Sequence, residues 1–201
     1  MSYRYTLLML VDSNLKRAKV GRNCPKTPPY FRCAGDVICT YTVNLGMRTW
    51  PSVEMIKERQ YTDIVIALGM NHCKQLNDYG ESQGRAISEL VGFYQDLRRY
   101  VPMARLYYVE VPPSVDSRIN ANIQRYNRTM CMMLSSIRVT VVTVPEQFYA
   151  EDGTLKLEYA RPRELLPGFR GQMLHLSDDA QNIYGYAIQR VICRTARKRM
   201  R

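Results

Sequence analysis

Short apolar runs alternate with stretches of helical periodicity along the chain. The runs are rich in β-branched residues and tyrosine, which is typical of strands, and they cover residues 5–11, 37–43, 63–68, 105–111 and 139–144. Because the runs are nearly unbroken rather than alternating, we expect strands of a sheet that is covered on both faces. The pattern therefore predicts five buried strands.

Helical periods lie between and after these runs. Apolar side chains recur at intervals of three and four residues over 87–97, 119–134 and 178–194, and Ser177 stands in the N-cap place of the last helix. Strands separated by helices pair in parallel through right-handed crossovers. We predict an α/β protein, a three-layer α/β/α sandwich built on a five-stranded parallel sheet. The 201 residues suit a single domain, 1–193, followed by a basic tail, 194–201.

The predicted sheet brings four polar or small residues to one edge. In open parallel sheets, ligands and catalytic groups lie at the carboxyl ends of the strands. Ser13 follows the first predicted strand, Gly46 lies in the segment after the second, and Asn71 lies after the third. His175, one of 2 histidines, precedes the last helix. We expect all four to converge there.

These residue types match what acyl transfer requires. The hydroxyl of Ser13 is a candidate nucleophile, and an imidazole such as that of His175 accepts a proton near neutral pH. The backbone N–H groups of Ser13 and Gly46, with the side-chain amide of Asn71, would form an oxyanion hole. The competing interpretation is structural: Asp12 and Ser13 end a strand and cap a helix, and the other residues are ordinary turn or buried groups.

The sequence around these residues resembles the SGNH hydrolases, also called the GDSL-type esterase and lipase superfamily. The similar blocks are "VDSNL" at 11–15, "NLGMRT" at 44–49, "DIVIALGMNHC" at 63–73 and "MLHLSDDAQNIYGYAI" at 173–188. The resemblance covers nearly the whole chain. It implies a flavodoxin-like SGNH hydrolase fold and a serine esterase that needs no cofactor and acts on acetyl or other short acyl esters. It also implies the roles given above to Ser13, Gly46, Asn71 and His175.

The chain departs from the family pattern at three positions. Val11 replaces the glycine of the first block, and His72 replaces the aspartate that follows Asn71. Gln172 stands where the family places the triad acid, and a glutamine brings no charge to stabilise an imidazolium. The sequence therefore predicts a Ser–His dyad, unless another carboxylate reaches the imidazole. The candidates for that role are Glu164, Asp178 and Asp179.

Charge adds a second hypothesis of a different class. Lys and Arg number 29 against 18 Asp and Glu, a net charge of +11, which favours anionic partners. An inactive SGNH-like module that binds RNA or DNA is therefore the alternative to an esterase. Divergent SGNH-like proteins include the RNA-binding domain of Oskar and esterases encoded by retrotransposons. The candidate contacts are Lys16, Arg17, Lys19, Arg194, Arg197, Lys198, Arg199 and Arg201.

The cysteines and apolar runs set further expectations. The 6 cysteines show no closely paired spacing, and one adjacent His72–Cys73 pair is no coordination pattern, so we expect reduced thiols and no metal site. Reduced thiols favour a cytoplasmic or nuclear location. No apolar run approaches the roughly 20 residues of a transmembrane helix, and we expect no secretory signal.

Overall fold

A computed structural model describes residues 4–12, 14–15, 32–39, 53–58, 60–74, 81–167 and 175–198. Its centre is a five-stranded sheet in the order β2-β1-β3-β4-β5. All neighbouring strands are parallel, which confirms the predicted sheet. The strands are β1 (Arg4–Val11), β2 (Arg32–Cys39), β3 (Asp63–Ala67), β4 (Arg105–Val109) and β5 (Thr140–Val142).

The second strand begins earlier than its apolar run. We predicted residues 37–43, whereas β2 pairs with β1 from Arg32, opposite Arg4, to Cys39, opposite Val11. Gly35 and Asp36 interrupt the hydrophobic pattern in this segment. An edge strand is held by hydrogen bonds to one neighbour only, so pairing rather than hydrophobicity defines its start.

Helices follow the predicted periods closely. The long helices are α3 (Glu81–Tyr100), α4 (Ser117–Leu134) and α5 (Asp178–Lys198), and the short ones are α1 (Val53–Glu58) and α2 (Met70–Cys73). Ser177 caps α5 as predicted, since its hydroxyl accepts a hydrogen bond from the Ala180 N–H at 3.2 Å. This helix continues to Lys198, past its predicted end at 194 and into the predicted basic tail.

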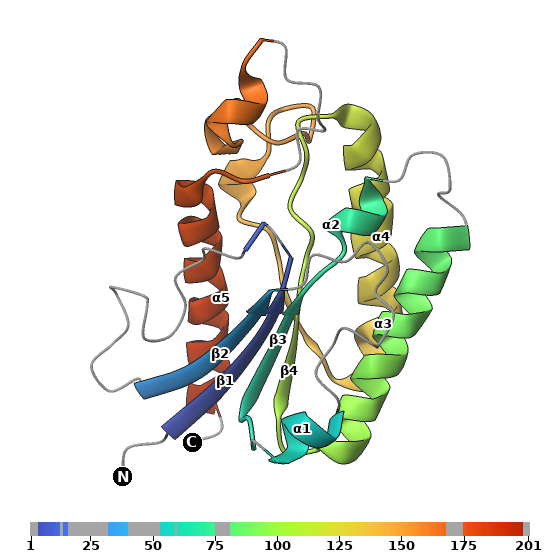
Figure 1. The fold of residues 1–201 in the computed structure, drawn as a ribbon, viewed down its shortest axis with the longest axis vertical. Coiled ribbons are helices and arrows are strands. Elements are labelled where there is room, and N and C mark those ends of the chain that lie inside the picture. Colours follow the sequence, from blue (N-terminus) through green and yellow to red (C-terminus); the bar gives the residue numbers. More distant parts are fainter. Residues whose placement is uncertain are drawn as a thin grey trace.

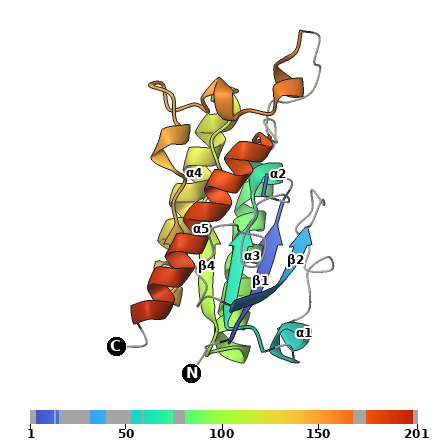
Figure 2. The same ribbon diagram turned by 90° about the vertical axis from the view of Figure 1, so that its left-hand side faces the viewer.

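The sheet lies between two helical layers, as Figures 1 and 2 show: α5 crosses one face, and α3 and α4 cover the other. Successive residues of β1 alternate between the two cores. Leu8 and Leu10 pack toward α3 and α4, whereas Leu7 and Met9 pack toward α5. This burial on both faces explains the unbroken apolar runs. Among the described residues, no helix combines the length and apolarity needed to cross a membrane.

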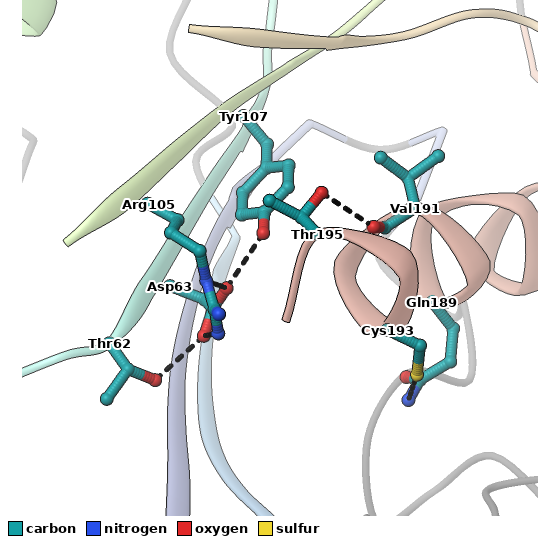
Figure 3. Close-up of polar contacts among 8 residues, drawn as sticks. All are labelled: Thr62, Asp63, Arg105, Tyr107, Gln189, Val191, Cys193 and Thr195. Carbon is teal, nitrogen blue, oxygen red and sulfur yellow. Dashed lines mark hydrogen bonds and ion pairs between the residues drawn. The ribbon is translucent and has the colours of Figure 1, made fainter. Parts of the chain in front are cut away.

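The amino end of the sheet is closed by a buried ionic cluster, the Asp63 cluster, drawn in Figure 3. Arg105 donates two hydrogen bonds to the Asp63 carboxylate, at 2.8 and 2.6 Å. The Tyr107 hydroxyl donates to the same carboxylate at 2.9 Å, and the Thr62 hydroxyl at 2.7 Å. Burial and the Asp63 charge raise the pKa of Tyr107. The cluster ties β3 to β4.

The carboxyl end is covered by short helical turns instead. Above it, near the top of Figure 1, the chain forms η4 (Glu146–Phe148), η5 (Leu157–Tyr159) and η6 (Pro162–Leu165). A bridge between Ala160 and Leu176 joins this segment to the start of α5. On the other side, Gly69 turns the chain from β3 into α2 with φ of 141°, and a Cβ there would lie 2.5 Å from the Tyr126 ring.

Candidate active site

The end of β1 is fixed by the buried carboxyl group of Asp12. Its oxygens accept hydrogen bonds from the N–H of Asn14 at 2.8 Å and from the N–H of Met70 at 3.3 Å. The Asp12 N–H donates to the Ala67 carbonyl at 3.1 Å. Burial raises the pKa of Asp12 to about 6, against the lowering effect of these N–H groups. Ser13 lies outside the described residues, between two neighbours whose places are defined.

Val11, which stands in place of a family glycine, is fully buried. Its side chain belongs to the core between the sheet and α5, together with Val65 and Ala67 of β3. The larger side chain therefore points away from the α3 and α4 layer and fits the existing core.

Asn71 and His72 lie in α2, directly after β3. Asn71 is half-buried, whereas His72 is 6% exposed. Neither ring nitrogen of His72 has a hydrogen-bond partner within the part of the chain that the structure describes. Burial lowers the pKa of His72. His72 is therefore a buried imidazole whose neutral form is favoured.

His175 is held in an extended segment just before α5. Its carbonyl accepts a hydrogen bond from the Arg161 N–H at 2.9 Å, and the Ser177 N–H donates to the Tyr159 carbonyl at 2.8 Å. These bonds join residues 175–177 to residues 159–161 in antiparallel fashion. The segment that leads into η6 therefore lies directly beside His175.

That packing brings the carboxylate of Glu164 onto His175. Oε1 of Glu164 is 2.5 Å from the imidazole Nδ1, and Oε2 accepts a hydrogen bond from the His175 N–H at 3.0 Å. Glu164 is only 3% exposed, and an Arg161 guanidinium nitrogen lies 4.0 Å from its Oε1. A buried carboxylate bound in this way fixes the ring orientation and stabilises an imidazolium.

The sequence predicts a Ser–His dyad unless another carboxylate reaches the imidazole, and the structure shows such a carboxylate at His175. Of the three carboxylates left open by the sequence, Glu164 contacts the imidazole, and Asp178 and Asp179 have exposed side chains in the first turn of α5. Gln172, at the usual acid position, lies outside the described residues. The sequence held no signal that would single out Glu164, because the contact depends on the fold of η6.

Asn14 joins the strand end to the histidine segment. Its buried side-chain oxygen accepts a hydrogen bond from the Leu176 N–H at 2.9 Å. Asp12 makes the corresponding link to Met70, which precedes Asn71. The two residues that flank Ser13 are thus bonded to the backbone next to Asn71 and next to His175. Gly46 lies outside the described residues, so its predicted convergence stays a prediction.

This arrangement supplies a proton acceptor, a carboxylate behind it and an amide at one sheet edge. Within the described residues, no three His, Cys, Asp or Glu side chains are grouped as metal ligands would be. Of the predicted nucleic-acid contacts, Arg194 is exposed on α5, and the backbone of Arg197 and Lys198 continues that helix. The side chains of these last two, and Lys16, Arg17, Lys19, Arg199 and Arg201 as a whole, lie outside what the structure describes.

No family model matches the sequence, and no curated protein matches it. Solved structures do match over nearly the full length. They include a GDSL-like lipase from Bacteroides thetaiotaomicron (11% identity, 94% of this chain and 88% of that one, TM-score 0.63). The esterase EstA from Pseudoalteromonas sp. is 13% identical over 96% and 98% of the two chains, with a TM-score of 0.62. The acetylxylan esterase Axe2 from Geobacillus stearothermophilus is 13% identical over 92% and 93%, with a TM-score of 0.64.

These likenesses establish the fold. The chain has the SGNH hydrolase fold, a parallel sheet flanked by helices, as the four sequence blocks implied. The low identities place it far from each of these proteins in sequence.

Proposed function

We propose that this protein is a serine ester hydrolase whose nucleophile is Ser13 and whose base is His175. The observation that carries the proposal is the pairing of His175 with the buried Glu164 carboxylate at the carboxyl end of the sheet. A histidine that only filled space would not need a buried ionic partner, which is costly to hold in the interior. The hydrogen bond from Leu176 to Asn14 supports the same assignment, because it joins the residue after His175 to the residue after Ser13.

The reaction uses these groups in two balanced halves. In the first, the Ser13 oxygen attacks the ester carbonyl carbon while Nε2 of His175 takes its proton, and Glu164 stabilises the imidazolium through Nδ1. The Ser13 and Gly46 N–H groups and the Asn71 amide bind the oxyanion. The intermediate then collapses, and the alcohol leaves with the proton from His175. In the second half, water attacks the acyl-serine by the same route and releases the acid and free Ser13.

The acyl group we propose is short, with acetyl as the first to test. Acetylxylan esterases are among the proteins that share this fold at a TM-score above 0.6, which supports the choice of acetyl. A 4-nitrophenyl series from acetyl to octanoyl would measure chain-length preference. The highest kcat/KM should fall on acetyl or another short ester.

The function is tested with 4-nitrophenyl acetate and two serine-to-alanine variants. Ser13→Ala should abolish hydrolysis, because it removes the nucleophile. Ser136→Ala, an exposed serine in η3 (Ser135–Ile137) at the opposite end of the sheet, is the matched control and should keep full activity. A fluorophosphonate probe should label the wild type once, at Ser13. Hydrolysis that persists in Ser13→Ala would contradict the proposal.

One observation favours the nucleic-acid alternative. Arg190 and Arg194 are both exposed and lie four residues apart on α5, whose backbone continues through Arg197 and Lys198. Fluorescence anisotropy of a single-stranded RNA at two salt concentrations tests it. Binding that weakens steeply with salt and is lost in Arg190→Glu/Arg194→Glu would support the alternative. Binding that ignores both changes would refute it.

A further inference from the structure

The nucleophile turn and the histidine segment meet through one buried amide. Asn14 is fully buried, and its Oδ1 accepts a hydrogen bond from the Leu176 N–H at 2.9 Å across 162 residues of sequence. Asn14 immediately follows Ser13, and Leu176 immediately follows His175. One hydrogen bond therefore joins the residue after the proposed nucleophile to the residue after the proposed base.

Leu176 is held on its other side as well. Its carbonyl accepts a hydrogen bond from Nε2 of Gln181, a fully buried residue in the first turns of α5, at 3.2 Å. Its side chain is fully buried in the core on the α5 side. Two side-chain amides therefore bind the backbone of Leu176: that of Asn14, next to Ser13, and that of Gln181 in α5.

The backbone of Asn14 is anchored independently of its side chain. The Asp12 carboxyl group accepts hydrogen bonds from the Asn14 N–H and from the Met70 N–H, so the Asn14 backbone and the start of α2 are held by the same carboxyl group. Among the described residues, the Asn14 side chain links that position to the Leu176 N–H. Glu164 binds the ring and the backbone N–H of His175 from η6, so it fixes His175 relative to η6, whereas the Asn14 bond fixes the segment relative to the end of β1.

We infer that Asn14 is a positioning residue that sets the reach between the Ser13 hydroxyl and the His175 imidazole. The inference rests on the proposed hydrolase function and adds to it a residue that touches no substrate. Without the amide oxygen, the buried Leu176 N–H loses its acceptor and the segment must shift to find another. A displacement of about 1 Å between catalytic groups can lower the rate by on the order of 100-fold.

Steady-state kinetics of three variants test this inference. Asn14→Leu removes the acceptor at similar volume, and kcat should fall roughly 100-fold with KM within about two-fold. Asn14→Asp keeps an oxygen acceptor for Leu176, and the amide nitrogen that it loses has no partner among the described residues. Its kcat should exceed that of Asn14→Leu by roughly ten-fold or more. Equal losses in both variants would overturn the inference.

Tyr107→Phe is the matched control for stability. It removes one buried hydrogen bond of the Asp63 cluster, at the far end of the sheet, and should lower stability while leaving kcat per folded molecule unchanged. Circular dichroism and urea unfolding give the folded fraction of each variant. If Tyr107→Phe lowered kcat as much as Asn14→Leu, the effect would be one of general stability, and the inference would fail.

An imidazole NMR spectrum separates this inference from the function on which it rests. The chain has 2 histidines, so the His175 signals are assigned from a His175→Gln spectrum. Asn14→Leu should shift the His175 signals and Tyr107→Phe should not, even in a Ser13→Ala background with no turnover. An inactive wild type with this shift would contradict the hydrolase and leave the positioning intact. An active wild type whose His175 signals stay unshifted in Asn14→Leu would support the hydrolase function and contradict the positioning role of Asn14.

Discussion

The two ends of the sheet differ in how completely their buried polar side chains are hydrogen-bonded. At the amino end, the Asp63 carboxylate receives hydrogen bonds from Arg105, Tyr107 and Thr62. At the carboxyl end, burial raises the pKa of Asp12, and both His72 ring nitrogens lack partners among the described residues. A carboxylate that is fully hydrogen-bonded, such as Asp63, stabilises the fold, whereas a buried imidazole without partners among the described residues, such as that of His72, costs stability, and such groups cluster at functional sites. We therefore interpret the amino end as the scaffold and the carboxyl end as the candidate site.

The largest effect on kcat is expected for Glu164→Gln, at the carboxyl end of the sheet. Loss of the carboxylate behind His175 should lower kcat by ~10⁴-fold, as removal of the triad acid does in serine proteases, because the imidazolium loses its stabilising charge. Ester hydrolysis measures the effect, and Asp178→Asn, an exposed carboxylate in the first turn of α5, is the control. A kcat within ten-fold of the wild-type value would contradict this prediction and indicate that Ser13 and His175 act as a dyad without Glu164.

Asp63→Ala should act in the opposite sense, on stability rather than on turnover. It leaves the Arg105 guanidinium, whose side chain is 12% exposed, without its carboxylate. The free energy of unfolding should fall by roughly 3–5 kcal/mol, with kcat per folded molecule unchanged. Arg85→Ala breaks an exposed ion pair with Glu89 and should cost under about 1 kcal/mol. Urea unfolding of the three proteins makes the comparison, and equal losses would contradict it.

A pH series on Asp12→Asn tests whether ionisation of the buried Asp12 carboxyl group lowers the stability of the fold. The pKa of Asp12 is raised from 3.8 to about 6 in the folded protein, so folding favours the protonated carboxyl. Its contribution to stability is full below pH 3.8 and is lost as the pH rises through about 6. Between pH 4 and 7, the wild type should lose about 2 kcal/mol relative to Asp12→Asn. A difference that does not change with pH would contradict this.

The smallest effect is expected at His72. His72→Leu removes two unpartnered buried nitrogens and should raise the free energy of unfolding by about 1 kcal/mol. Because folding lowers the pKa of His72, protons bind the unfolded chain more readily, and the wild type loses stability as the pH falls below about 6.5. The advantage of the variant should therefore grow from pH 7 to pH 5. Urea unfolding that shows a constant or negative difference would refute it.

Hydrophobic periodicity was sufficient to predict the sheet and the long helices. β1, β3 and β4 coincide with apolar runs because each is buried between two helical layers, and the partly buried edge strand β5 lies within its run as well. The start of β2 was not predictable in this way, since Gly35 and Asp36 break its pattern and only pairing with β1 defines it.

The site was predictable in part. The rule that functional groups lie at the carboxyl ends of parallel strands predicts the positions of Asn71 and His175. The two residues that flank Ser13 bind the backbone beside these positions: Asp12 binds the Met70 N–H, and Asn14 binds the Leu176 N–H. The partner of His175 did not follow, because Glu164, Asp178 and Asp179 are equivalent in sequence. Their separation depends on the bridge between Ala160 and Leu176, a tertiary contact with no local signature.

The place of Glu164 has a consequence for how such proteins are recognised. The acid and the histidine that it contacts are 11 residues apart and belong to different structural elements, η6 and the segment before α5. A pattern search that requires an acid three residues before the histidine would discard this chain as an inactive relative. Sequences that lack that acid should be re-sorted by whether a Glu or Asp occupies the preceding short helical turn.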